Sequence, residues 1–398
     1  MKPDQISLLE SVCPACHYTL SAKFFFGEAQ PLSTLGWPSS SEQAEAMQKH
    51  PLDYVQCIRC THIWNRSFLY EAIPYSKQPN RMFNSGITWQ GHLKKMRETS
   101  VCDLPSNPTV IDIGCGEGHF VRGISEEFEM EGRFLGFDPN SSPESGLGVE
   151  FQCRLFDPLV DIQKFSPDLL IMRHVLEHLA DPAAFVDQLA WAANKLEKPV
   201  FFLAEVPCID NALASNRLVD FFYEHPSQFT TESFERLLKR GGKNVILGHG
   251  YENEVVFGKV LLGVPNDYER RAVISNAFSD TAEKVTAAVR RQLKQLVAEG
   301  NSIAIWGGTG KAAAFMNLYD VDKESFPLVV DSDRNKVGTF VPKTGQKIQD
   351  LDVLKKTPVD IIIVPSRWRI NDIVSEIERE EIIAKKILIE LGGQMVEA

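Results

Sequence analysis

The sequence of 398 residues lacks any long apolar run, any low-complexity segment and any excess of basic residues. No apolar stretch approaches the roughly 18 residues that a membrane-spanning helix requires. The 42 Lys and Arg residues are outnumbered by 53 Asp and Glu residues, which gives a net charge of −11. Because phosphate backbones are bound by clustered cations, this balance argues against nucleic-acid binding. We therefore expect neither a membrane partner nor a nucleic-acid partner.

An apolar signal core is also missing from the first residues, Met1 to Gln5, which predicts a cytoplasmic protein. Hydrophobic residues form 43% and charged residues 24% of the chain, as in globular proteins with a sizeable core. At about 150 residues per domain, the length predicts two or three domains. For the oligomeric state we expect a monomer or a weak homo-oligomer.

Cysteine is sparse, but half of the eight cysteines fall into two C-x-x-C pairs. The paired residues are Cys13, Cys16, Cys57 and Cys60. In a reducing compartment such pairs bind metal more often than they form disulfides. Four thiolates close a tetrahedron around Zn²⁺ with no open position, so we predict a structural zinc site. The alternatives are four buried or free cysteines, or a site in which His17 or His62 replaces a thiolate.

Composition divides the chain into three segments, from which we predict three domains. Residues 1–75 are rich in cysteine, proline and aromatic residues and form the predicted zinc-binding domain. Residues 85–265 alternate short β-rich runs with helical stretches, which predicts a doubly wound parallel sheet. Residues 268–398 begin with a helix to about residue 298 and continue with a second alternation, which predicts a Rossmann-like α/β domain. The predicted strands are 109–113, 133–137, 169–172, 200–205 and 255–262 in the second segment, and 302–306, 328–330, 360–364 and 386–389 in the third.

A predicted strand that runs into a glycine-rich turn carries the first functional signal. Residues 110–118 contain the spacing G-x-G-x-G, which differs from the G-x-G-x-x-G of dinucleotide-binding folds. The acids of this turn, Asp112 and Glu117, repel phosphate but attract a ligand with an amino group and a sulfonium. After the next predicted strand, Asp138 can accept hydrogen bonds from both hydroxyls of a ribose. The alternative for the glycines is a plain tight turn.

This arrangement resembles the S-adenosylmethionine site of the class I methyltransferases. The run at residues 172–182, Met-Arg-His-Val-Leu-Glu-His-Leu-Ala-Asp-Pro, is also similar to that superfamily. The resemblance implies that the cofactor is held by Asp112, Gly114, Gly116, Asp138 and His174. From the same run, His178 could reach the substrate; the alternative is a histidine that packs against the following helix.

A second cluster of ionisable residues follows the strand at 200–205. Tyr223, Glu224 and His225 place a phenol, a carboxylate and an imidazole in consecutive positions, a set suited to proton transfer near neutral pH. The alternative is a surface turn that caps the helix beginning near Thr230. His225 is the best match to a general base because the ordinary pKa of histidine is near 6.5. We expect the carboxylate of Glu224 to orient this imidazole and to raise its pKa.

The order of these parts resembles the sugar C-methyltransferases that modify the 3-position of nucleotide-linked 4-keto-6-deoxyhexoses, and the resemblance covers nearly the whole chain. In that family the run is Tyr-His-Glu-His, so Glu224 and His225 match, whereas Phe222 and Tyr223 differ. His174 stands where the family has asparagine. The resemblance implies that Tyr75 contacts the substrate and that zinc and S-adenosylmethionine are the cofactors. It also implies a catalytic group, which consists of His225, Glu224, Tyr223 and His178.

In the third segment, the glycine-rich run at residues 307–311 follows a predicted strand and opens a helix, which is typical of an anion site. It is not a P-loop, because the first glycine and the residue after the lysine do not match. The family resemblance implies that this turn, with Lys311, holds the nucleotide diphosphate of the substrate. The alternative is a Rossmann-like scaffold without a ligand.

The reaction implied by the resemblance starts when a base removes the proton next to the ketone. The enolate carbon then attacks the methyl group of the sulfonium, while the protein holds both centres in line. Two other hypotheses stay open: an O- or N-methyltransferase acting on another small molecule, and a non-catalytic cofactor-binding scaffold. Only carbon methylation requires the loss of a C–H bond.

Overall fold

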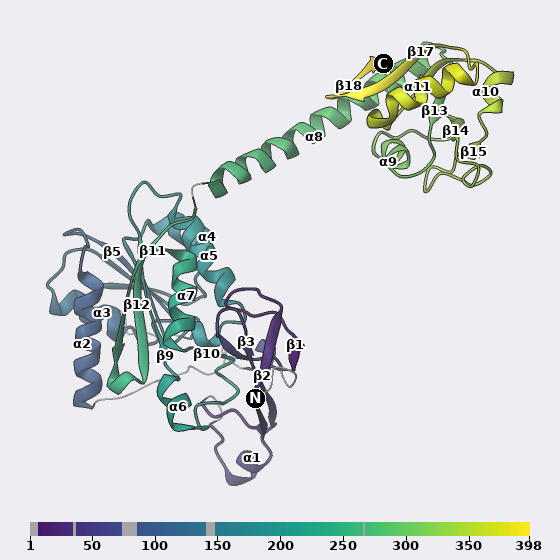
Figure 1. Cartoon of the computed structure of the whole chain (residues 1–398). Helices are drawn as coiled ribbons and strands as arrows, with labels where there is room; N and C mark the ends of the chain where they lie inside the picture. The colour runs from purple at the N-terminus through teal and green to yellow at the C-terminus, as the bar shows by residue number, and fades with distance from the viewer. Residues whose placement is uncertain (1–6, 35–36, 74–85, 141–147, 266) are drawn as a thin grey trace. The chain divides into compact units, whose positions relative to one another are not determined.

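The computed structural model describes residues 7–34, 37–73, 86–140, 148–265 and 267–398. The chain forms two compact units, Met1–Pro265 and Asn266–Ala398, which hold three separate sheets (Figure 1). Across the described ranges, no helix combines the length and the apolar character that crossing a membrane requires.

The first sheet has five strands in the order β1-β2-β3-β4-β10, and neighbouring strands pair antiparallel. Its strands are β1 (Leu8–Glu10), β2 (Leu20–Gln30), β3 (His50–Cys57), β4 (Ile63–Asn65) and β10 (Ser227–Gln228). Two short helices, α1 (Ser41–Glu45) and η2 (Tyr70–Ala72), belong to the same part of the chain. The edge strand β10 comes from much later in the sequence, since Ser227 pairs with Trp64. The segment around His225 is therefore attached to the cysteine-rich part.

The second sheet has seven strands in the order β11-β12-β9-β8-β5-β6-β7. Its strands are β5 (Thr109–Ile113), β6 (Arg133–Phe137), β7 (Val149–Gln152), β8 (Leu169–Arg173), β9 (Phe201–Pro207), β11 (Gly242–Gly250) and β12 (Val255–Leu262). The five strands from β9 to β7 run parallel, whereas β12 is antiparallel to both of its neighbours. The order reverses between β5 and β8, and open α/β sheets bind ligands at the carboxyl edge beside such a point.

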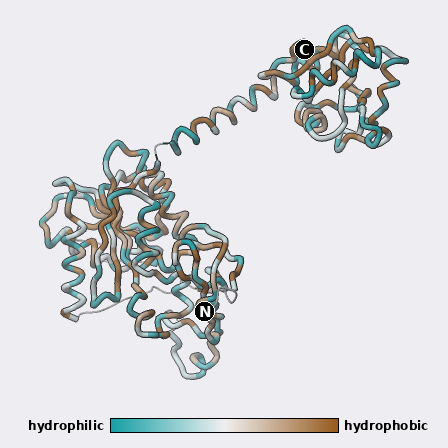
Figure 2. Tube along the Cα trace, in the orientation of Figure 1, coloured by the Kyte–Doolittle hydropathy of each residue, from teal (hydrophilic) through white to brown (hydrophobic). Residues whose placement is uncertain are grey.

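Helices cover both faces of this sheet (Figure 1). The helices of this part of the chain are α2 (Ile87–Val101), α3 (His119–Glu127), α4 (Pro158–Phe165), η3 (Leu176–His178), α5 (Pro182–Ala193), α7 (Thr231–Gly241) and η4 (Tyr251–Asn253). A further helix, α6 (Asp210–Ser215), packs instead against the N-terminal sheet, where Ala212 joins Leu52 and Tyr54. Side chains alternate along each strand. Ile111 packs in the core with α4, α5 and α7, whereas Val110 packs with α2 and α3. The apolar strands are brown in Figure 2.

The second unit holds a six-stranded sheet in the order β15-β14-β13-β16-β17-β18, in which only β18 is antiparallel to its neighbour. Its elements are α8 (Asp267–Ala298), β13 (Ile303–Trp306), α9 (Lys311–Leu318), β14 (Leu328–Val330), β15 (Ile348–Gln349), α10 (Asp352–Lys356), β16 (Val359–Ile363), η5 (Arg367–Arg369), α11 (Ile370–Arg379), β17 (Ala384–Leu391) and β18 (Gln394–Glu397). The C-terminal part of α8 and α9 pack on one face, and α10 and α11 pack on the other.

The predicted α/β class with two doubly wound sheets is confirmed. Strands predicted at 109–113, 133–137, 255–262 and 328–330 match the structure at both ends, and the other predicted strands differ only at their ends. The sequence pattern did not predict β7 or β11, because both are edge strands that carry polar or glycine residues. The division into three domains stays a prediction.

Truncation of one buried residue in each unit tests whether the two cores are independent. Ile305→Ala should destabilise the second unit by about 2–5 kcal/mol, because the fully buried side chain leaves a cavity. Ile111→Ala, in β5, is the matched change in the first unit. Differential scanning calorimetry should show each variant moving a different unfolding transition. Equal shifts of one shared transition would contradict separate cores.

Candidate functional site

The glycine-rich turn leaves β5 at the carboxyl edge of the seven-stranded sheet. Gly114, Gly116 and Gly118 have φ angles of 74°, 54° and 77°, a region that favours glycine. A Cβ on Gly114 would lie 2.3 Å from Val175, and one on Gly118 would lie 2.5 Å from Phe151. By contrast, nothing lies within 4 Å of a Cβ placed on Gly116. The outer glycines therefore permit tight packing, and the middle one faces space that a ligand can enter.

Asp138, which follows β6, lies against this turn. Its Oδ2 accepts a hydrogen bond of 3.1 Å from the amide of Gly116, and its Oδ1 accepts one of 2.8 Å from the amide of Asn140. The turn is also held to β6 by the amide of Gly114, which donates to the carbonyl of Phe137 at 2.7 Å. The carboxylate predicted to bind a ribose thus lies beside the open glycine.

Asp112 is buried at the end of β5, with 3% of its surface exposed. Burial, opposed by Arg173 and reinforced by Asp138, raises the pKa of Asp112 to about 7. A cationic ligand close to this carboxyl would therefore favour its ionised form.

His174 turns the chain sharply after β8, with a φ angle of 54°. Its Nε2 lies 3.1 Å from Oε1 of Glu205 and its Nδ1 lies 3.6 Å from Oε1 of Glu177. Burial lowers the pKa of His174, but the two carboxylates outweigh it and raise the pKa to about 9. His174 is therefore positively charged at neutral pH. Its role in cofactor binding stays a prediction.

A buried charge network that sequence reasoning missed surrounds Glu205 of β9. Arg173 donates to its carboxylate at 2.8 Å, and His92 of α2 makes a short hydrogen bond with it. Burial would raise the pKa of Glu205, but Arg173, His174 and His92 hold it well below the usual range. Arg173 lies next to His174 in the sequence, whereas nothing in the sequence pattern connects His92 of the earlier helix to either residue.

The structure brings together two histidines that the sequence predicted separately. Nδ1 of His178 donates to the backbone carbonyl of Glu224 at 2.7 Å, which ties the loop after β8 to the segment before β10. The rings of His178 and His225 meet edge to face, with centroids 4.8 Å apart. One side-chain nitrogen or oxygen atom from each of Glu177, His178 and His225 lies within 4.8 Å of the corresponding atoms of the other two.

The expected increase in the pKa of His225 is wrong. Burial and the neighbouring His178 lower the pKa of His225 to about 3, and Glu177 opposes this decrease. The cost of placing a charged imidazole in a dry site exceeds the attraction of the carboxylate. His225 is consequently neutral near pH 7, which is the form that can accept a proton.

The other two residues of the predicted catalytic run face the N-terminal sheet. Oε1 of Glu224 accepts hydrogen bonds from the amide and the hydroxyl of Thr34, at 2.7 and 3.2 Å. The hydroxyl of Tyr223 accepts one from the amide of Leu69 at 2.9 Å, and its ring stacks on His50. Within the described ranges, no hydrogen bond or ring contact joins the side chain of Tyr223 to His178 or His225.

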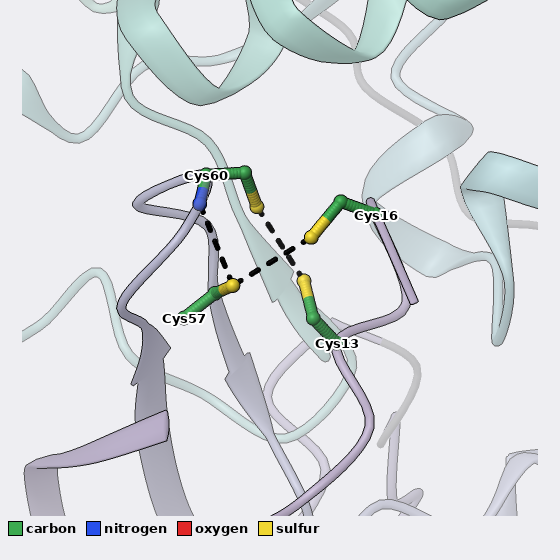
Figure 3. A group of neighbouring side chains, drawn as sticks. All are labelled: Cys13, Cys16, Cys57 and Cys60. Carbon is green, nitrogen blue, oxygen red and sulfur yellow. Dashed lines mark hydrogen bonds between the residues drawn. The ribbon is translucent and has the colours of Figure 1, made fainter. Parts of the chain in front are cut away.

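The four paired cysteines, two from the loop between β1 and β2 and two from the end of β3 and the turn after it, converge on one point (Figure 3). Sγ of Cys13 lies 3.6 Å from Sγ of Cys60, and Sγ of Cys16 lies 3.6 Å from Sγ of Cys57. Four sulfurs at about 2.3 Å from a tetrahedral Zn²⁺ are roughly 3.8 Å apart, so the group fits that ion. The two alternative ligands are bonded elsewhere: His17 lies 3.0 Å from Asp181, and His62 lies 3.1 Å from Ser227.

Of the two predicted substrate contacts, Tyr75 lies outside the described residues. Lys311 opens α9, and its Nζ lies 5.8 Å from the centre of the Trp368 ring. At the same turn, the amide of Gly308 donates to Oδ2 of Asp331 at 3.3 Å. This contact repeats the arrangement of Gly116 and Asp138 in the first unit.

Two family models match the chain. A methyltransferase domain matches residues 89–247, and a C-methyltransferase C-terminal domain matches residues 270–394. The C-methyltransferase NovU of Streptomyces niveus is 22% identical over 73% of this chain and 74% of its own length. The ubiquinone biosynthesis O-methyltransferase of Idiomarina loihiensis is 30% identical, but over only 23% of this chain and 40% of its own length.

Similar solved structures include the plantazolicin methyltransferase BpumL, which is 15% identical with a TM-score of 0.32 over 44% of this chain and 84% of its own. The magnesium protoporphyrin IX methyltransferase of Synechocystis is 14% identical with a TM-score of 0.32, over 46% of this chain and 90% of its own.

The strand order of the seven-stranded sheet and the glycine turn beside Asp138 define a class I methyltransferase fold. The two domain matches and the similarity to NovU make the assignment more specific. The chain belongs to the S-adenosylmethionine-dependent C-methyltransferase family.

Cofactor affinity should depend on pH through Asp112. Because the pKa of Asp112 is raised to about 7, the free protein gains a proton there as the pH falls, and it then attracts the cationic cofactor less. The dissociation constant should rise by up to about tenfold for each pH unit below 7. Calorimetry between about pH 5.5 and 8 can measure this slope. In Asp112→Asn this dependence of the dissociation constant on pH should vanish. An unchanged pH dependence in that variant would contradict the prediction that Asp112 lies next to the cofactor.

Proposed function

We propose that this C-methyltransferase acts on C3 of a nucleotide-linked 4-keto-6-deoxysugar, with His225 as the base that removes the C3 proton. The observation that carries the proposal is the contact between the buried His178 and the half-buried His225, whose ring centroids are 4.8 Å apart. His178 lies in the loop after β8, next to the strand that carries the glycine turn. Methylation of oxygen or nitrogen would need no base for a C–H bond.

His225 begins the reaction as a neutral imidazole and accepts the proton next to the ketone, while the C–H electron pair moves into an enolate. His178 uses Nδ1 to hold the backbone of Glu224. Its Nε2 is the candidate donor to the enolate oxygen. Bound S-adenosylmethionine supplies a methyl group activated by its positively charged sulfur. Asp112, Asp138 and the glycine turn hold the cofactor at the carboxyl edge of the sheet.

Zinc has a structural role in this proposal. A site closed by four cysteines leaves no position for a substrate, so the ion stabilises the N-terminal sheet. That sheet in turn holds the catalytic segment: the hydroxyl of Tyr54 in β3 donates to the carbonyls of Phe222 and His225, at 2.8 and 3.1 Å. Zinc therefore supports the position of the base indirectly.

The second unit is proposed to bind the nucleotide part of the substrate. Gly307, Gly308 and Gly310 bring the chain from β13 to the amino end of α9, where amides and Lys311 can meet a diphosphate. Asp331, at the end of β14, is the candidate acceptor for ribose hydroxyls, by analogy with Asp138 in the first unit.

Freshly purified protein should contain one zinc ion per chain. Cys13→Ser should lose that zinc and lower the melting temperature, because three ligands bind the ion more weakly and binding is coupled to folding. Cys102→Ser is the matched control, since Cys102 is exposed and lies outside the cluster. Elemental analysis that finds no zinc in the unaltered protein, without exposure to chelators, would refute the site.

Replacement of His225 by asparagine should decrease kcat by roughly 10²–10⁴, the usual contribution of a general base, and leave cofactor affinity unchanged. The unaltered protein should also exchange the hydrogen next to the ketone with deuterium from the solvent, and His225→Asn should not. A mass shift of the recovered 4-keto sugar nucleotide measures this exchange.

Two outcomes would contradict this assignment in different ways. Rapid turnover by His225→Asn combined with an inactive Tyr223→Phe would make the phenol the base. Methylation without any C–H exchange by the unaltered protein would instead favour an oxygen or nitrogen acceptor.

A further inference from the structure

Glu177 is a buried carboxylate that none of the steps of the proposed reaction uses. It lies in η3 between Leu176 and His178, with 1% of its surface exposed. Neither of its oxygens accepts a hydrogen bond within the described part of the chain. Among the described residues, the ion pair of Glu177 is the contact of 3.6 Å with Nδ1 of His174. Burying a carboxylate without hydrogen bonds is costly, so nearby positive charge must compensate for it.

The carboxylate of Glu177 lies close to three imidazoles. His174 lies on one side, and the ligand atoms of His178 and His225 lie within 4.8 Å of its carboxylate. Burial would raise the pKa of Glu177, but the contact with the positively charged His174 is the largest of the effects that lower it, so the ionised carboxylate is favoured. A fixed negative charge therefore lies beside the proposed base.

His225 needs such a charge when it accepts a proton. Burial, His178 and the positively charged His174 all disfavour its protonated form. Behind His174, the charges of Glu205 and Arg173 largely compensate one another through their own contact. Among the described residues, Glu177 is the carboxylate that favours protonated His225.

Glu224, the carboxylate that the sequence suggested for this role, is placed differently. Its Oε1 accepts both the amide and the hydroxyl of Thr34, so this oxygen anchors the N-terminal segment. The contact of Glu224 with the active-site histidines is made by its backbone carbonyl, which accepts from His178.

We propose that Glu177 is a positioning residue that stabilises the imidazolium of His225 while the carbon proton is removed. This inference rests on the proposed function. The C–H bond breaks, its electron pair forms the enolate, and the proton moves to His225, where the negative charge of Glu177 compensates for it. After the enolate carbon takes the methyl group and the C–S bond breaks, His225 returns the proton to solvent.

The experiment compares variants that separate charge from shape. Glu177→Gln keeps the size of the side chain and removes its charge, so kcat and the rate of C–H exchange should fall roughly 10²-fold. The KM and the cofactor dissociation constant should stay within about twofold, because the residue acts on the transition state. Glu177→Asp, which keeps the charge on a shorter side chain, should recover part of the lost rate.

Chemical rescue provides the readout that a purely structural role would not change. In Glu177→Ala, added formate can restore a carboxylate in the vacated space, whereas formamide restores only the volume. We expect rescue of kcat by formate and none by formamide. Equal rescue by both, or near-normal kcat in Glu177→Gln, would overturn the inference.

A bound metal is the other chemistry that a carboxylate and two histidines could serve. Elemental analysis that finds a second metal ion per chain, lost from both Glu177→Gln and His225→Asn, would overturn the charge-compensation role. Failure of the proposed function looks different, because the unaltered protein would then show no C–H exchange. If the unaltered protein exchanges, His225→Asn does not and Glu177→Gln is normal, only the inference about Glu177 fails.

Discussion

The hydrogen bond from His178 to the carbonyl of Glu224 joins the two parts of the first unit that the proposed chemistry requires. One side of this bond is the loop after β8, which lies beside the glycine turn of the seven-stranded sheet. The other side is the segment that continues into β10 and completes the N-terminal sheet. The bond therefore places the proposed base beside the loop that flanks the proposed cofactor turn. The cysteine cluster contributes by stabilising the sheet to which β10 is attached.

Desolvation governs the electrostatics of the site. It raises the pKa of Asp112 to about 7 and lowers the pKa of His225 to about 3, in each case because burial disfavours the charged form. A cationic cofactor beside Asp112 would lower the pKa of this carboxyl again. Proton transfer to His225 must overcome the low pKa of that imidazole. Asp112 and His225 thus differ from Glu205 and His174, whose charges are already favoured by their contacts with each other in the free protein.

Much of the fold follows from local patterns. The runs Thr109–Ile113 and Arg133–Phe137 are buried strands bounded by turns, so their ends could be read from the sequence. Edge strands such as β7 carry too few apolar residues for their ends to be predicted from the sequence.

The residue types of the site could also be predicted, but the directions in which their side chains point could not. Tyr223, Glu224 and His225 are consecutive, yet the hydroxyl of Tyr223 accepts a hydrogen bond from Leu69 and a carboxylate oxygen of Glu224 accepts one from Thr34. The imidazole of His225 packs instead against the ring of His178. These directions depend on tertiary contacts with residues about 150 to 190 positions away along the chain.

Methylation of carbon is tested most directly by following the hydrogen and the methyl group in one product. A nucleotide-linked 4-keto-6-deoxyhexose carrying deuterium at C3 would be incubated with the protein and with S-adenosylmethionine bearing an isotope-labelled methyl group. NMR of the product should show that the deuterium is lost and that the labelled methyl group is bonded to C3. A product that retains the deuterium and carries the label on oxygen or nitrogen would contradict carbon deprotonation at this site.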